Sequence, residues 1–310
     1  MKKPHWTLAI LVLLLCSCAV PVIPGLPPVV MGEFQVFPPD NPWNTDISGF
    51  PVHPNSDAFL ASIGLDTGLH PDFGTVWAGA PNGIPFVLVN DGQAMVDIAY
   101  VAYGDESDPG PFPVPDDAPV EGGNESDGDR HVIVVDVDNH VLYELYRAFK
   151  TATGWQADSG AKWNLDSNAL RPKYWTSADA AGLPIFPGLV RYDEVESGEI
   201  THALRFTVSQ TQRGFISPAR HFASWSDDPA LPPMGLRVRL KAGTDISGFS
   251  PRVQVILQAL KTYGMMVADN GGDWFLSGAP DMRWDDEELA ELRQVKGRDF
   301  EVVYTGDIEK

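Results

Sequence analysis

The spacing of glycine and proline is the feature that most limits what this chain can fold into. The chain holds 29 glycines and 27 prolines in 310 residues. Both residue types interrupt helices, because proline lacks a backbone N–H and glycine has too much conformational freedom. After Gly64 they recur too often for long helices. Between them lie short runs rich in β-branched or aromatic residues, which predict strands over 83–89, 94–103, 130–137, 140–149, 203–209 and 236–242.

These runs predict a mainly β fold, with a sandwich or jelly-roll-like core and a few short peripheral helices. Residues 131–146, "HVIVVDVDNHVLYELY", form the clearest hairpin pattern, with Asp138 and Asn139 at the turn. No repeat with a period of 20–50 residues occurs in the chain. A propeller or solenoid is therefore disfavoured.

Outside residues 170–206, helices are expected at three places. Ser56 is a possible N-cap for a short helix that ends at Gly64. A longer helix should begin with Ser250 as N-cap and Pro251 as first residue and end at Gly264; its apolar stripe is Val253, Ile256, Leu257 and Leu260. Residues 285–297 begin with acidic residues and end with glycine, which favours a third helix.

The N-terminus has the order of a secretory signal: Lys2 and Lys3, then an apolar stretch from Trp6 to Leu15. About ten apolar residues are too few to span a bilayer, which requires about twenty. The sequence "Leu15-Cys16-Ser17-Cys18" resembles a bacterial lipobox with Cys18 at the acylated position, and an ordinary cleaved signal is the alternative. We therefore expect an exported protein, lipid-anchored to the cell membrane or outer membrane and facing outside the cytoplasm.

Three segments follow from this pattern. Residues 1–17 are the expected signal peptide, 18–42 a proline-rich tether, and 43–310 one β-rich extracytoplasmic domain or two intimate subdomains. Both cysteines lie at positions 16 and 18, so the exported domain is expected to contain no disulfide and no cysteine metal site. The formal net charge of −20 disfavours nucleic acid as a partner, because such a surface repels phosphate.

The acidic segment 104–130 raises the question of a metal site. Asp127 and Asp129 lie on a glycine-rich turn, and Ca²⁺ prefers several oxygen ligands on flexible backbone. Calcium is therefore a possible cofactor, although the sequence requires none. A solvated surface loop is the alternative interpretation.

Residues 170–206 concentrate aromatic and charged side chains. Trp175 offers a flat face on which a sugar ring can stack, and Tyr192 and Arg191 are candidate substrate-binding residues. Residues 191–198 are expected to form a short helix.

The same segment holds three of the candidate catalytic residues: Asp193, Glu194 and His202. A carboxyl in an apolar setting can act as general acid. Asp193 and Glu194 are adjacent, so they should point apart and cannot both belong to one catalytic pair.

Two Arg-His pairs complete the candidates. Arg130 precedes His131, and Arg220 precedes His221. A neighbouring guanidinium should lower the pKa of the imidazole and leave a neutral base that removes a proton α to a uronate carboxylate, with arginine neutralising the developing charge. Neighbours on a strand point to opposite faces, so one member of each pair is more easily structural.

Several enzyme classes lack their motifs in this chain. There is no G-x-S-x-G elbow, no H-E-x-x-H, no phosphate-binding Gly-Lys-Ser/Thr loop and no dinucleotide fingerprint. These absences disfavour serine hydrolases, zincins and enzymes that use nucleotides.

Several longer motifs, among them "GDRHVIVVD", "WTSADAAGLPIFPGLVRYDEV", "PARHFAS" and "ILQALKTYGMMVADNGGDWFLSGAPDMRW", resemble a widespread group of uncharacterised secreted bacterial proteins. The resemblance covers most of residues 40–305. It implies export and one integral folded unit, and it transfers no catalytic residue.

Two functions fit these observations. The first is a carbohydrate-active enzyme, a polysaccharide lyase or glycoside hydrolase. The second is a noncatalytic surface module that binds glycan or a protein. Convergence of the Arg-His pairs with Asp193 and His202 in one concave site would favour catalysis, and scatter would favour binding.

Overall fold

The computed structural model describes residues 34–310. The expected signal, the acylation position Cys18 and most of the expected tether lie outside the described residues. The end of the tether is part of the folded domain: Phe37 and Asn41 are buried, and Asn44 Nδ2 donates hydrogen bonds to the carbonyls of residues 36–38. The packed part of the chain therefore begins before residue 43, the expected boundary.

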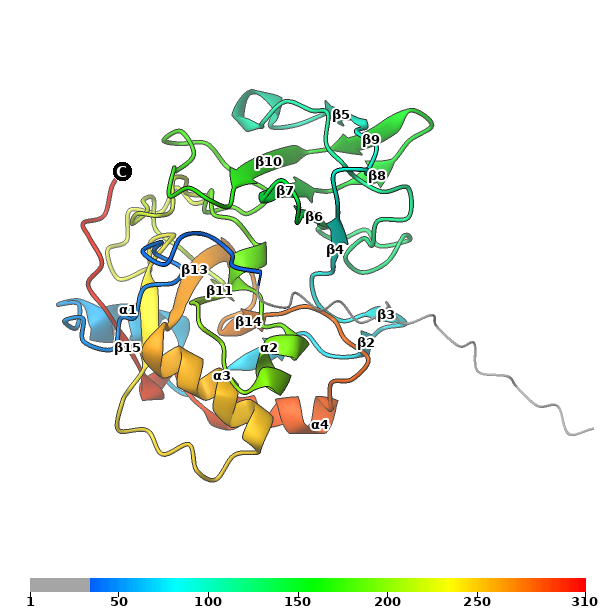
Figure 1. Ribbon diagram of the computed structural model, residues 1–310. Coiled ribbons are helices and arrows are strands. Elements are labelled where there is room, and N and C mark those ends of the chain that lie inside the picture. Colours follow the sequence, from blue (N-terminus) through cyan, green and yellow to red (C-terminus); the bar gives the residue numbers. More distant parts are fainter. Residues whose placement is uncertain (1–33) are drawn as a thin grey trace, which may run out of the picture.

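The larger of the two main sheets has six strands in the order β1-β14-β11-β13-β12-β15 (Figure 1). It is mixed, since β1 pairs with β14 and β11 with β13 in parallel, while the other pairs are antiparallel. The strands are β1 His70–Asp72, β11 Leu204–Val208, β12 Arg237–Leu240, β13 Met265–Asn270, β14 Phe275–Ser277 and β15 Phe300–Val302.

The second main sheet has the order β10-β7-β6-β4 and lies above the first in Figure 1. Its centre is the expected hairpin, in which Asp136 of β6 pairs with Val141 of β7 and the Asn139 side chain donates to Asp136 at the turn. The strands are β4 Phe86–Val89, β6 Val132–Asp136, β7 Val141–Tyr146 and β10 Ser159–Asn164. Two small sheets flank it, formed by β5 Asp97–Tyr100, β8 Phe149–Lys150 and β9 Gly154–Ala157, and by the hairpin β2 Val76–Trp77 and β3 Ala80–Pro81.

The helices are short and flank the six-stranded sheet (Figure 1). Helix α3, Pro251–Thr262, matches the expectation, and its four stripe residues are fully buried. Helix α1, Ser56–Ile63, has Asn55 rather than Ser56 as N-cap; Ser56 Oγ instead accepts from the Val302 N–H. The expected helix over 285–297 is broken into α4, Asp286–Leu289, and the 3₁₀ turns η3, Ala290–Gln294, and η4, Gly297–Asp299. The remaining helical elements are α2, Tyr192–Ser197, and the 3₁₀ turns η1, Gly104–Glu106, and η2, Phe186–Gly188.

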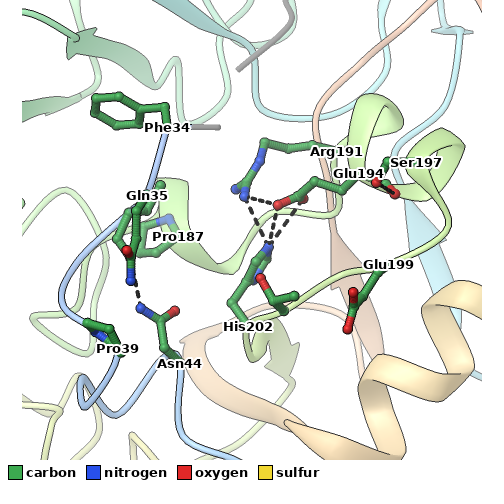
Figure 2. A pocket seen from close by; sticks show the side chains of 12 residues that line it. Phe34, Gln35, Pro39, Asn44, Pro187, Arg191, Glu194, Ser197, Glu199 and His202 are labelled. Carbon is green, nitrogen blue, oxygen red and sulfur yellow. Dashed lines mark hydrogen bonds and ion pairs between the residues drawn. The ribbon is translucent and has the colours of Figure 1, made fainter. Parts of the chain in front are cut away.

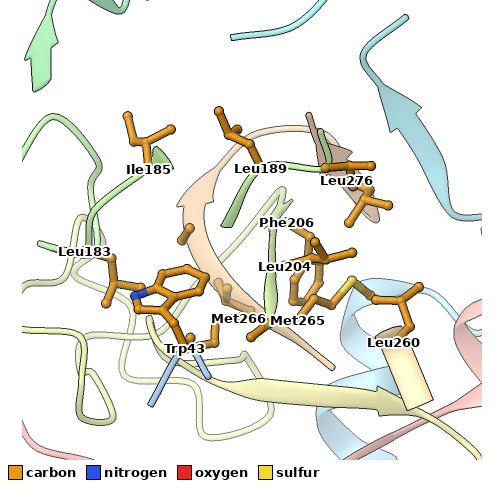
Figure 3. Packing of buried hydrophobic residues seen from close by; sticks show 14 of the residues in the cluster. Trp43, Leu183, Ile185, Leu189, Leu204, Phe206, Leu260, Met265, Met266 and Leu276 are labelled. Carbon is orange, nitrogen blue, oxygen red and sulfur yellow. The ribbon is translucent and has the colours of Figure 1, made fainter. Parts of the chain in front are cut away.

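The principal core lies between the six-stranded sheet, its helices and one face of the four-stranded sheet. Trp43, Phe206 and Met266 pack here with leucines from several strands and loops (Figure 3). A smaller cluster around Phe112, Tyr143 and Trp155 lies on the other face of the four-stranded sheet. The four-stranded sheet is therefore covered on both sides, which explains why β6 is buried throughout and apolar at its first four residues.

The described residues form a mainly β protein with few, short helices, as expected from the sequence. Among residues 34–310, no helix has the length and apolar character needed to cross a bilayer.

Candidate functional site

Three candidate residues meet at one cavity of about 470 Å³, as Figure 2 shows. Arg191 precedes helix α2, Glu194 lies within it, and His202 precedes strand β11. Gly198 in the left-handed conformation ends the helix and turns the chain back toward β11. This short helix and return loop place side chains from positions 191–202 in contact.

The three side chains are already paired with one another. Arg191 donates to Glu194, and its Nη2 lies 3.1 Å from His202 Nε2. His202 Nε2 lies 3.2 Å from Glu194, and Nδ1 lies 2.8 Å from the carbonyl oxygen of Ala203. Burial acts to raise the pKa of Glu194, but the charges of Arg191 and His202 outweigh it and lower the pKa. Glu194 is therefore ionised, which does not suit a general acid at neutral pH.

Tyr192 and Asp193 are not among the residues that line this cavity. Tyr192 is buried, packs edge-on against Trp284, and lies beneath the guanidinium of Arg283 at 4.2 Å. The pKa of the same Arg283 is raised chiefly by its hydrogen bond and charge interaction with Asp281, and the charge of Asp193 adds to this. The adjacent acids Asp193 and Glu194 thus interact with different arginines, Arg283 and Arg191, as expected for neighbours that point apart. Tyr192 contributes to packing.

The acidic loop is organised by Arg130. Its Nη1 donates to the carbonyl oxygens of Asn124 at 2.8 Å and Ser126 at 2.7 Å, and its Nε donates to Ala148 at 3.1 Å. The guanidinium also lies 4.2 Å from the ring centre of Phe149. The Arg130 guanidinium therefore occupies backbone carbonyl oxygens of the acidic loop.

Asp127 and Asp129, the expected calcium ligands, are exposed. Within residues 34–310, no group of three or more His, Cys, Asp or Glu side chains is arranged to hold a metal ion. Calcium at this loop stays a prediction.

His131 faces away from Arg130. Its Nδ1 lies 2.6 Å from Glu121 Oε2, and its Nε2 lies 3.0 Å from the carbonyl oxygen of Ala178. Burial acts to lower its pKa, but Glu121 outweighs burial through charge and hydrogen bonding and raises the pKa to about 9. The expectation that a neighbouring arginine lowers this pKa is wrong, because the nearer partner is a carboxylate. His131 is therefore cationic near pH 7.

The second Arg-His pair supports the backbone of residues 171–181. His221 Nδ1 lies 2.7 Å from the carbonyl oxygen of Ala180, and Arg220 Nε donates to the carbonyl of Arg171 at 3.0 Å. Trp175 lies in the same segment, with the Arg171 guanidinium 5.7 Å from its ring centre. These contacts give Arg220, His221 and Trp175 a supporting role in this loop.

A buried ionic network lies between the two main sheets. Arg205 on β11 donates to both oxygens of Asp179, at 3.1 and 3.2 Å, and to Ser277 Oγ at 2.6 Å. Asp179 follows Ala178, the partner of His131. The network thus joins the two sheets through the segment around Asp179. His131 and His221 contact that segment at Ala178 and Ala180, whereas Arg130 contacts the acidic loop, so the Arg-His residues do not meet in one cleft.

Two hollows lie on either side of the β2–β3 hairpin, where the hairpin faces the acidic loop. The smaller, about 290 Å³, is lined by Asp72, Trp77, Asn82, Glu121 and Ser126 among others. The larger, about 700 Å³, is lined on its apolar side by Val120, Phe149 and Trp155 and on its polar side by Asn124, Arg130 and Lys150. Ala80 and Pro81 border both.

Trp77 is the residue that sequence reasoning missed here. It is 75% exposed, although large aromatic side chains usually lose most of their exposed surface. The available signal was its position in a two-residue strand next to the Ala78-Gly79 turn, where no apolar periodicity would bury it. Asp72 and Glu121 carry no such local signal, since only the fold brings them together.

Comparison with known proteins returned no match: no protein-family model, no curated protein and no solved structure resembles this chain closely enough to be aligned with it.

Proposed function

We propose that this protein is an extracytoplasmic carbohydrate-binding protein, and that the β2–β3 hairpin and its two hollows are the binding surface. The observation that carries the proposal is the exposed indole of Trp77 beside a hollow lined by hydrogen-bonding side chains. A sugar ring presents an apolar C–H face and a rim of hydroxyls. An aromatic platform next to carboxylate, amide and hydroxyl groups matches both.

The larger hollow extends this surface. Phe149 is partly exposed, while Arg130 and Lys150 bring positive charge into an otherwise acidic region. Asp116 pairs with Lys150 at 3.2 Å. Apolar walls with a few fixed polar groups are typical of ligand pockets, and two adjoining hollows suit an extended chain of sugars better than a single small molecule.

The scatter of the candidate residues favours binding over the catalysis first expected from them. His131, His202 and His221 each have near partners within the protein, and they lie at three different places. Arg130 and Arg191 likewise serve separate sites. The alternative partner, a protein, has no comparable supporting feature among residues 34–310.

The location of the protein outside the cytoplasm is part of the same proposal. The signal pattern and Cys18 support export and a lipid anchor, which would hold the binding surface outside the cytoplasm. We also propose a sandwich or jelly-roll-like arrangement, which the packing of the two main sheets on one principal core supports.

Retention of the full chain on cellulose, chitin, xylan, pectin and alginate would test the proposal. Trp77→Ala should weaken binding about tenfold or more, as expected for loss of a central aromatic contact. Trp225→Ala is the matched control, because Trp225 is 80% exposed and lines neither hollow. Equal loss in both variants, or no retention of the unaltered protein on any polymer, would refute the proposal.

A further inference from the structure

The smaller hollow contains two carboxylates whose surroundings differ. Asp72 ends strand β1, and Glu121 lies on the acidic loop. Both line the hollow together with Trp77. They come from separate elements of the fold, so a ring placed against the indole would have carboxylates from two elements in the same hollow.

Glu121 forms an ion pair with a cationic histidine on its buried side. Its Oε2 accepts from His131 Nδ1 at 2.6 Å, and His131 is fixed in turn at the carbonyl of Ala178. The side chain of His131 is 4% exposed, whereas that of Glu121 is 24% exposed. The carboxylate therefore has one face on a buried imidazolium and another face open to the hollow.

Asp72 occupies a different position. It pairs in register with Ser277 of β14, and Ser277 Oγ accepts from Arg205. Arg205 itself is neutralised by Asp179. Asp72 therefore lies near the buried Arg205–Asp179 pair but, among residues 34–310, forms no ion pair of the kind that joins Glu121 to His131.

These surroundings separate the pKa values of the two acids. Asp72 is exposed toward the hollow; desolvation by the surrounding protein first, and the charge of Glu121 second, raise its pKa against the opposing charge of Arg205. Burial acts to raise the pKa of Glu121, but His131 outweighs it and lowers the pKa. Two neighbouring carboxyls pushed in opposite directions are the arrangement that divides acid and base roles in enzymes.

We propose that the smaller hollow is a catalytic site that hydrolyses a glycosidic bond of the carbohydrate bound against Trp77, with Asp72 as general acid and Glu121 as general base. The inference rests on the proposed carbohydrate binding and adds a reaction to it. His131 is a positioning residue, since it acts on the substrate only through Glu121.

The reaction balances with water as the only co-reactant. Asp72 gives its proton to the glycosidic oxygen as the bond from that oxygen to the anomeric carbon breaks. Glu121 takes a proton from water, whose oxygen bonds to the anomeric carbon. One hydroxyl appears on each product, and transfer of the proton from Glu121 back to Asp72 through solvent restores the starting state.

The test uses soluble forms of the polymers on which the protein is retained. It measures the release of reducing ends and, in the same samples, the absorbance of unsaturated products. We expect reducing ends without unsaturated products from the full chain. Asp72→Asn and Glu121→Gln should each lower the rate at least about a hundredfold while retention on the polymer persists. Glu125→Gln, at an exposed acid of the same loop that lines neither hollow, should leave the rate unchanged.

The outcomes separate the two proposals. Retention without any product would overturn the hydrolysis and leave carbohydrate binding intact, whereas absence of retention would overturn the binding itself. Unsaturated products, or full activity in either carboxylate variant, would also contradict the assignment. Glu121→Gln leaves His131 without its anion and can therefore prevent folding. Asp72→Asn keeps the test valid if the Glu121→Gln variant does not fold. His131→Gln should shift the acidic limb of the pH–rate profile to higher pH, because Glu121 loses the cation that lowers its pKa; loss of packing alone would not do this.

Discussion

His131 and Glu121 form a buried ion pair in which both imidazole nitrogens have acceptors. Nδ1 donates to Glu121 Oε2 at 2.6 Å, and Nε2 donates to the carbonyl of Ala178 at 3.0 Å. Only the imidazolium can donate from both nitrogens at once. This pair therefore stabilises a charged histidine inside the protein, between strand β6 and the segment that carries Asp179.

This ion pair predicts a loss of stability at alkaline pH. The pKa of His131 in the folded protein is about 9, above the ordinary value of 6.5, so its contribution is complete below pH 6.5 and is lost as the pH rises through 9. The difference corresponds to about 3 kcal/mol in the free energy of unfolding. Urea unfolding across this range should show the decline, and His131→Gln should remove it. His140→Gln, at an exposed ion pair with Asp166, is the control; a decline that persists in His131→Gln would contradict the prediction.

Glu144 predicts a second pH effect, at lower pH. It is fully buried on β7 and accepts hydrogen bonds from the backbone N–H groups of Ile185 and Phe186, both at 2.8 Å. Burial raises its pKa from 4.5 to about 7. Because the folded state holds the proton more tightly, its contribution to stability is complete below pH 4.5 and is lost as the pH rises through 7.

Two substitutions at Glu144 separate its charge from its hydrogen bonds. Glu144→Gln keeps an acceptor and should flatten the change in unfolding free energy between pH 4.5 and 7, measured by urea titration. Glu144→Ala leaves two buried N–H groups without an acceptor and should lower stability by about 2–4 kcal/mol throughout. Equal stability of the Gln and Ala variants would show that these hydrogen bonds contribute nothing.

The sequence predicts well the features that local patterns determine. The β6–β7 hairpin and helix α3 follow from residue periodicity and turn residues, and the contact of Arg191, Glu194 and His202 arises within twelve residues of chain. The broken helix after Asp285 shows the limit. An acidic first turn and a later glycine suit a helix, but tertiary packing of Leu289 and Leu292 sets where it changes to 3₁₀ geometry.

The hollow beside Trp77 could not be predicted in this way. Asp72 reaches it because β1 pairs in register with β14, about two hundred residues later, and no local period encodes that pairing. His131 was recognised as a candidate, but its true partner Glu121 belongs to a loop without regular structure. The same limit applies to Arg130, whose acceptors are backbone oxygens that carry no sequence signature.

Removal of Arg130 should loosen the acidic loop. Arg130→Met deletes the donors to Asn124, Ser126 and Ala148, and we expect a loss of about 2–3 kcal/mol in unfolding free energy together with faster amide exchange over residues 121–129. Arg147→Met is the control, since Arg147 is half-exposed and pairs with Asp158. Unchanged exchange in Arg130→Met would mean that the loop is held by other contacts.

Calcium gives an independent test of the same loop. Because Arg130 holds the carbonyl oxygens of Asn124 and Ser126, and no group of three or more His, Cys, Asp or Glu side chains within residues 34–310 is arranged to hold a metal, millimolar Ca²⁺ should leave the Tm of the unaltered protein unchanged relative to a chelator. A rise in Tm that disappears in the Asp127→Asn, Asp129→Asn double variant would instead support the calcium site expected from the sequence.

The pair Asp179–Arg205 predicts strong coupling between two buried charges. Arg205 contacts both oxygens of Asp179, and both side chains are almost completely buried. Asp179→Asn or Arg205→Met alone should lower the unfolding free energy by about 3–5 kcal/mol, because each leaves a buried charge without its partner. The double variant should lose clearly less than the sum of the two, since it removes both charges together. A double-mutant cycle measured by urea unfolding gives this coupling. Additive losses would show that solvent or other groups already compensate each charge. In that case the connection between the two sheets would not depend on this ion pair.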